Sequence, residues 1–267
     1  MLTVRWAVGS PMKRPLQEKS VRMFAASLAA ARSVWPNARR IVQVNNGPEQ
    51  QRARLLGIAR AAGCEAVDGF ELLVDHPNVA DLKPFTHTGR AWWKFLPPRF
   101  DPDSHELFLD ADNVIWEEPR AIREWRRDPH AGVLGHADVG ESNYDRHVPG
   151  PFEDLVPKDL SLNSGLFGFG PGVPFDPPLE LSSMPNGDYS WGSDQGFVAL
   201  NFVRRGTHRV SMDEVRIPFS VGAAQEAVAD PTVKGVHFAG HSVQQRDFWT
   251  RFERDVLDRV RGSALNL

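Results

Sequence analysis

Cysteine is almost missing from this 267-residue sequence, which has Cys64 alone. One thiol cannot form an intrachain disulfide or a zinc site built from several cysteines. Long apolar runs are missing too. No stretch approaches the ~18 apolar residues of a membrane span, and the first residues lack the apolar core of a signal peptide. We therefore expect a protein without a membrane span in a reducing compartment, the cytoplasm.

No sign of charge dominates either, since 31 Lys and Arg face 34 Asp and Glu, giving a formal net charge of −3. Such a chain has no overall attraction to nucleic acid. The hydrophobic share of 41% and the charged share of 24% are ordinary for a globular protein. The length suits one α/β domain with additions.

The first seventy residues alternate between strand-like and helical patterns. Strands are expected at 3–8, 41–44 and 64–67, and helices at 21–35 and 48–62. Pro36 and Gly63 supply the helix ends. This alternation predicts an α/β fold with a mainly parallel central sheet flanked by helices, whose strands end at one common edge.

The second half has a different texture, in which short strand-like pieces alternate with turns rich in glycine and proline. Strands are expected at 132–136, 165–169 and 216–221, helices at 88–95, 119–127, 193–203 and 245–261, and a surface loop at 168–187. Four arginines on the helix at 119–127 are interpreted as a solvated face. The later strands read as additions to the first half rather than as a separate domain.

The central feature is the segment 106–112, Glu-Leu-Phe-Leu-Asp-Ala-Asp, in which an apolar run ends in two acids. The run is typical of a strand buried on both faces. Ligands of open α/β sheets bind beyond the carboxyl ends of such strands, where Asp110 and Asp112 could share one cation. The alternative is a strand end closed by turn-forming acids. Asp101 and Asp103 have the same spacing, but prolines surround them and no strand precedes them.

Three further motifs follow in order: Leu-Asn-Ser-Gly-Leu-Phe-Gly-Phe at 162–169, Ser-Asp-Gln-Gly-Phe at 193–197, and Gly-Val-His-Phe-Ala-Gly at 235–240. The second opens a helix, with Ser193 as its expected cap and Asp194 near its positive end. The third places His237 in a short strand before a glycine turn.

In this order the four motifs resemble those of nucleotide-sugar glycosyltransferases of the GT-A fold, most closely the glycogenin and lipopolysaccharide galactosyltransferase family. The resemblance runs from about residue 3 to residue 240. It implies a single GT-A-like domain over residues 1–267. Residues 1–130 would form a Rossmann-like, nucleotide-binding half. Residues 131–267 would form the donor and acceptor half with the final helix.

The resemblance also implies a metal site. Asp110, Asp112 and His237 would hold Mn²⁺ or Mg²⁺ on the diphosphate of a nucleoside diphosphate sugar, with UDP as the expected nucleotide. A hard dication held by oxygen and imidazole neutralises the leaving group as the glycosidic bond breaks. For His237 the competing interpretation is a hydrogen-bonded core histidine.

The remaining implied contacts are with the donor. The nucleotide-sugar-binding residues would be Ala7, Val8, Gly9, Lys94, Asp110, Ala111, Asn163, Ser164, Gly165, Gly240 and Arg246, and the catalytic residues Asp194 and Gln195. Structural alternatives stay open: Gly9 as a strand terminator, Lys94 as a solvated lysine, Asp194 as a charge at a helix start. With retention of configuration the departing phosphate can take the acceptor proton. With inversion Asp194 is the candidate base.

The family's Lys-Pro-Trp after the histidine motif is absent, and Arg246, His241 or Lys234 would have to grip the phosphate. The implied acceptor is a hydroxyl of a saccharide, lipid-linked glycan, protein or modified nucleobase. Two alternatives remain. One is a sugar-phosphate nucleotidyltransferase, although the first loop has one glycine where a triphosphate needs several. The other is a catalytically silent sugar-nucleotide-binding module.

Overall fold

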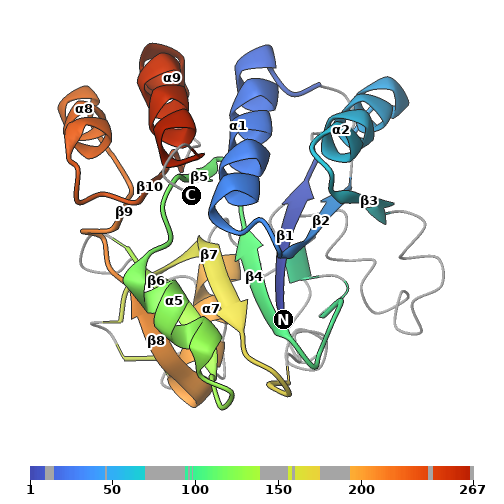
Figure 1. Ribbon diagram of the computed structural model, residues 1–267, viewed down its shortest axis with the longest axis vertical. Coiled ribbons are helices and arrows are strands. Elements are labelled where there is room, and N and C mark those ends of the chain that lie inside the picture. Colours follow the sequence, from blue (N-terminus) through green and yellow to red (C-terminus); the bar gives the residue numbers. More distant parts are fainter. Residues whose placement is uncertain are drawn as a thin grey trace.

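The computed structural model describes residues 1–9, 15–45, 47–69, 94–95, 97, 99–138, 156–157, 160–174, 193–239 and 243–264, the backbone alone being described at 193, 243–247 and 263–264. Two β-sheets and several helices make up this part of the chain (Figure 1). None of the described helices is long and apolar enough to cross a membrane.

Ten strands are described: β1 (Leu2–Val8), β2 (Arg39–Val44), β3 (Glu65–Asp68), β4 (His105–Leu109), β5 (Asn113–Ile115), β6 (Val133–Ala137), β7 (Leu162–Phe169), β8 (Gly206–Val210), β9 (Val215–Arg216) and β10 (Gly235–His237). The described helices are α1 (Glu18–Val34), α2 (Glu49–Ala61), α5 (Arg120–Arg127), α7 (Ser193–Arg205), α8 (Val221–Ala229) and α9 (Val243–Ala264).

Seven strands form one sheet in the order β3-β2-β1-β4-β7-β6-β8, and β5-β10-β9 form a second. In the large sheet the pairs β1–β2, β1–β4, β2–β3 and β6–β8 are parallel, while β7 runs antiparallel to β4 and β6. The expected α/β fold with a mainly parallel sheet is confirmed. Because β1, β2 and β4 are parallel, their carboxyl ends share one edge.

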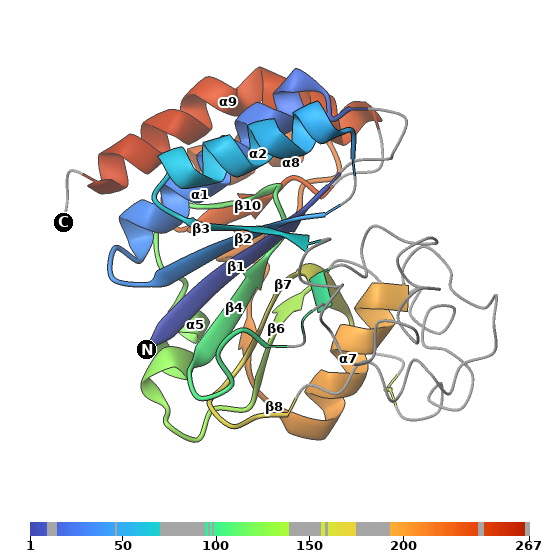
Figure 2. The ribbon, with the colours of Figure 1, turned by 90° about the vertical axis from the view of Figure 1, so that its right-hand side faces the viewer.

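Helices cover both faces of the large sheet (Figure 2): α1 and α2 lie on one face and α7 on the other. Helix α1 buries two sides. Phe24 and Leu28 belong to the cluster that contains the β1 and β4 side chains, whereas Met23 and Ala30 pack in the cluster formed by α8, α9 and the small sheet. Helix α1 thus fixes the small sheet relative to the large one.

Strand β4 is buried on both faces, as the apolar run predicts. Leu107 and Leu109 lie in the main core. Phe108, on the other face, stacks on Phe167 with ring centroids 4.3 Å apart. This double burial holds the end of β4 rigidly, and the two acids follow directly.

Several sequence-based boundaries are wrong. The strand expected at 216–221 ends at Arg216, and α8 starts at Val221, because the Ser220 hydroxyl accepts a hydrogen bond from Ala223 N and caps a helix. Strands β5 and β8 were not expected. Helix α7 includes Ser193 instead of being capped by it.

The loop expected at 168–187 starts too early, because Gly168 and Phe169 belong to β7. Its later part, from 175 onward, lies outside the described residues. So does the helix expected at 88–95, apart from residues 94 and 95.

Candidate metal centre

The two acids lie in the turn that joins the two sheets, between β4 and β5. Asp110 N–H donates to Gly165 O across the large sheet at 2.8 Å, and Asn113 N–H donates back to Asp110 O at 3.0 Å. The second bond closes a tight turn around Ala111. Hydrogen bonds therefore fix the backbone of the turn that carries both carboxylates.

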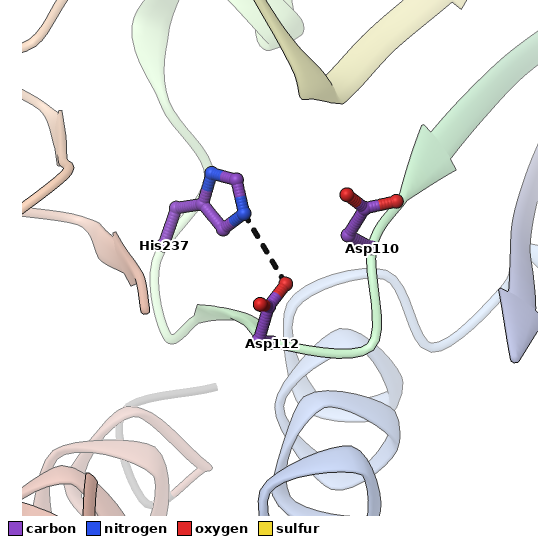
Figure 3. Close-up of side chains that lie close together, drawn as sticks. All are labelled: Asp110, Asp112 and His237. Atoms are coloured by element: carbon purple, nitrogen blue, oxygen red, sulfur yellow. Dashed lines mark ion pairs between the residues drawn. The ribbon is translucent and has the colours of Figure 1, made fainter. Parts of the chain in front are cut away.

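His237 comes from far along the chain and reaches the acids through the small sheet. β10 pairs antiparallel with β5 and places His237 opposite Asn113, and Phe238 N–H donates to Asp112 O at 2.9 Å. The imidazole Nε2 lies 3.2 Å from Asp112 Oδ1 (Figure 3). One ligand atom from each of Asp110, Asp112 and His237 falls within 4.8 Å of the others. The expected trio is brought together.

This donor set fits a divalent cation. Ligands about 2.1 Å from one metal are at most about 4.2 Å apart, so small side-chain rotations would close the cluster. Two carboxylates and one imidazole suit Mn²⁺ or Mg²⁺. Three protein ligands also leave half of an octahedral shell for oxygens of another molecule. Among the residues that the structure describes, no other group of three His, Cys, Asp or Glu side chains is close enough to hold an ion.

The protonation states show how strongly these groups interact. Burial raises the pKa of the Asp110 carboxyl; the Lys94 ammonium opposes the rise and the Asp112 carboxylate adds to it. Burial alone would raise the pKa of Asp112 and lower that of His237. Their mutual attraction outweighs it, so the pKa of Asp112 is lowered and that of His237 is raised. In the absence of a metal ion, the proton on His237 balances the negative charge of Asp112. A bound dication would supply this positive charge instead.

Lys94 joins the metal centre to α7. Its Nζ lies 3.0 Å from Asp110 Oδ1 and 3.2 Å from Asp194 Oδ2, and donates to Ser164 O at 3.1 Å. Burial opposes its charge, yet the carboxylates of Asp110 and Asp194 outweigh burial and the pKa of Lys94 is raised. Lys94 is thus a buried, charged member of the site and not a solvated lysine. The Ser164 hydroxyl also donates to Asp194 Oδ2 at 2.5 Å.

A buried charge network lies beneath Lys94. The Arg5 guanidinium donates to Glu106 Oε1 and to the Lys94 carbonyl, each at 2.9 Å, and it also lies over the Phe108 ring. Both Arg5 and Glu106 are fully buried, so each neutralises a charge that would otherwise be costly. This pair anchors the backbone from which Lys94 reaches the site. The sequence signal for this network is Arg5, a lone arginine inside an apolar strand.

Strand β7 supplies a second support. Asn163 Oδ1 accepts from Gly165 N at 2.7 Å, while its Nδ2 donates to Asp138 Oδ2 at 3.2 Å. Asn113 Nδ2 donates to Gly165 O at 2.7 Å. Asp138 and Asn113 were not expected as part of this site. Each stands at an end of a strand, which is the signal that could have identified them.

The structure describes some of the other expected donor-binding residues. Ala7 and Val8 end β1 and Gly9 follows it; Asn45 N–H donates to Val8 O at 2.8 Å, so this end is held against β2. Gln195 lies in the first turn of α7.

The expected nucleotide-sugar-binding residue Gly240 lies outside the described residues, and so do two of the expected phosphate-gripping groups, His241 and the side chain of Arg246 in α9. Lys234 is the third candidate for gripping the phosphate. It precedes the amino end of β10 and pairs with Glu117 at 2.6 Å, whereas His237 stands at the carboxyl end.

No family model and no curated protein matches this chain. Solved structures are similar in shape. The galactosyltransferase LgtC, in complex with donor and acceptor sugar analogues, has 13% identity and a TM-score of 0.52, and the match covers 98% of this chain and 99% of LgtC. Mouse xyloside xylosyltransferase 1 has 14% identity and a TM-score of 0.53, over 91% and 98% of the two chains.

The bifunctional glycosyltransferase WbbM also matches, with 13% identity and a TM-score of 0.53 over 97% of this chain and 51% of WbbM. At such identities the likeness establishes the fold. The chain has the GT-A fold of these glycosyltransferases, which confirms the fold that the four sequence motifs predict.

Proposed function

We propose that this protein is a metal-dependent glycosyltransferase that moves a sugar from a nucleoside diphosphate sugar, with UDP as the nucleotide, to an acceptor hydroxyl with retention of configuration. The observation that carries the proposal is the convergence of Asp110, Asp112 and His237 at the carboxyl edge of a GT-A sheet. A reducing compartment, the cytoplasm, is part of the proposal because the chain has a single cysteine.

The charge balance of the site supports a diphosphate ligand. Two carboxylates and a dication sum to about zero, so phosphate oxygens can complete the metal shell without strong repulsion. When bound, Mn²⁺ or Mg²⁺ would neutralise charge that builds on the leaving diphosphate. Asp110, Asp112 and His237 would hold the ion, and the Lys94 ammonium would add a fixed positive charge beside it.

Asp194 and Gln195 are placed at the sugar in this proposal. Asp194 opens α7 and is held by Lys94 and Ser164, so its carboxylate has a fixed position from which to accept hydrogen bonds from sugar hydroxyls. Its Oδ2 already contacts two donors of the protein, Lys94 Nζ and the Ser164 hydroxyl, so this oxygen is engaged within the site. This supports retention, in which the departing phosphate takes the acceptor proton.

The rest of the donor site is assigned by position. The ends of β1 and β2 lie on the same edge as Asp110, so Ala7, Val8 and Gly9 would contact the base and ribose through their backbone groups. Ala111, between the two acids, would contact the nucleotide. Asn163, Ser164 and Gly165 would line the sugar, and Gly240 and Arg246 the phosphates.

The experiment is a thermal-shift screen of nucleotide sugars with Mn²⁺ and with EDTA, followed by assay of nucleoside diphosphate release. A bound donor at about 100 times its dissociation constant adds about 2.7 kcal/mol to stability. We expect a shift that requires both a UDP-sugar and the metal. No metal-dependent shift with any donor would refute the proposal. A shift without release in the presence of acceptors would indicate a silent binding module.

A further inference from the structure

An aromatic side chain stands exposed at the start of α8, in the segment that follows β9. Among the described residues the exposed large hydrophobic side chains are Met1, Val203, Phe219 and Val221, and two of these four are neighbours at the start of α8. Phe219 is 56% exposed. Ser220 and Gly222 are exposed as well, so residues 219–222 form one uncharged surface, which we call the Phe219 patch.

The strand register places this patch on the metal edge. β9 runs parallel to β10, with Val215 opposite Gly235 and Arg216 opposite Val236. Extended by one residue beyond the end of β9, this register would put Ile217 level with His237, and Phe219 follows two residues later. At about 3.5 Å per residue and about 5 Å between strands, the Cα atoms of Phe219 and His237 are within about 12 Å. In Figure 1, β9 and β10 lie side by side, and α8 connects them along the chain.

The ring lies next to a capped helix start and is not covered. Ser220 caps α8, which makes Phe219 the residue before the cap. An apolar residue there commonly packs on the fourth helical residue, here Ala224. Ala224 is fully buried by other contacts, while Phe219 keeps more than half of its surface in water. The ring is therefore presented to solvent from a rigid helix start.

We infer that Phe219 is the stacking platform for a sugar ring of the acceptor, so that the acceptor is a saccharide. The inference rests on the proposed function. An aromatic face carries partial negative charge and attracts the C–H groups on the apolar face of a pyranose. The position beside His237 would put a neighbouring hydroxyl of that saccharide near the transferred sugar.

The size and charge of the patch favour a saccharide over a protein or a membrane. The exposed part of Phe219 amounts to roughly 100 Å², whereas a stable protein interface takes about 800 Å² from each partner. Anionic lipid and nucleic acid attract basic clusters. The residues on either side of the patch are instead mainly acidic: Asp213, Glu214 and Glu226. The nearby base Arg216 is already paired with Asp230. A neutral sugar ring suits this surface.

The test is saturation-transfer NMR of the whole protein, with Mn²⁺ and UDP, against maltose, cellobiose and lactose at millimolar concentration. We expect at least one disaccharide to bind, with the signal strongest on the ring hydrogens of one face. Phe219→Ala should weaken binding about fivefold to tenfold. Phe219→Trp should retain it, and so should Val203→Ala, which truncates an exposed apolar side chain on α7.

Circular dichroism would confirm that each variant is folded. Unchanged disaccharide binding by folded Phe219→Ala would overturn the inference, as would no binding by the wild type. Binding of the wild type to phosphatidylserine vesicles, lost in Phe219→Ala, would overturn it in favour of a lipid acceptor. The donor thermal shift of the wild type tests the proposed function separately. If that shift fails, Phe219-dependent disaccharide binding still supports the platform.

Discussion

Gly165 and His237 lie so close that no side chain fits between them. A Cβ added to Gly165 would be 2.2 Å from Cε1 and 2.6 Å from Nε2 of the imidazole. The glycine in the Asn-Ser-Gly motif is therefore needed for space, because it leaves room for the ring that completes the metal trio. Two motifs separated by some seventy residues are thus linked by one contact.

Gly165→Ala should displace the His237 ring and abolish the metal-dependent thermal shift. Overpacking of this kind costs about 1–3 kcal/mol of unfolding free energy, so the metal-free variant should still fold. The measurement is a thermal melt with and without Mn²⁺. Gly57→Ala is the control, because a Cβ there meets nothing within 4 Å. Within a helix that change should stabilise by about 0.5–1 kcal/mol and leave the Mn²⁺ shift intact.

Asp112→Asn should also abolish the metal-dependent shift, because an amide oxygen replaces the charged ligand beside His237. The metal-free variant should remain folded. Asp103→Asn provides the matched control, since Asp103 belongs to the other Asp-x-Asp pair and is exposed. Full sugar-nucleotide turnover by Asp112→Asn would remove the metal role from this carboxylate.

Lys94→Met should destabilise the metal-free protein by about 3–5 kcal/mol, since it leaves Asp110 and Asp194 without their shared buried cation. A dication can partly replace the lost charge, so Mn²⁺ should raise the melting temperature of this variant more than that of the wild type. Lys234→Met breaks a surface pair and should cost under about 1 kcal/mol. Equal effects of the two changes in urea titrations would contradict the central role of Lys94.

His136 should make the protein sensitive to mild acid. Burial lowers its pKa to about 3, and its Nε2–H donates to Val215 O at 2.9 Å. Between pH 6.5, its pKa when unfolded, and pH 3 the unfolded chain binds a proton that the folded chain does not, so stability falls as the pH falls.

From pH 7.5 to 5.5 this effect amounts to about 1.4 kcal/mol. His136→Gln keeps a donor and has no such titration. The loss of urea stability between these pH values should therefore be about 1.4 kcal/mol smaller in the variant. An identical loss in both proteins would show that His136 is protonated in the folded state.

Local sequence patterns predicted most of the first half. The apolar run at 107–109 determined a strand buried on both faces. Pro36 follows the end of α1 because proline cannot continue a helix, and Gly63, with its positive φ of 75°, follows the end of α2 because glycine readily adopts that backbone conformation. The acid pair could be assigned to the end of this strand because the apolar run stops directly before Asp110. Short segments were predicted less well. Residues 216–221 have a strand-like pattern, but Ser220 caps a helix there. Strand β5 has only three residues, too few for a recognisable pattern.

Tertiary structure alone decided which distant residues share the site. The sequence determined most strands of the large sheet and the ordered motifs, because hydrophobic period and turn chemistry act over a few residues. The pairing of β5 with β10 brought His237 to Asp112, and burial placed the Lys94 charge between Asp110 and Asp194. These contacts depend on strand pairing and side-chain packing across the whole chain, which no local pattern of residues encodes.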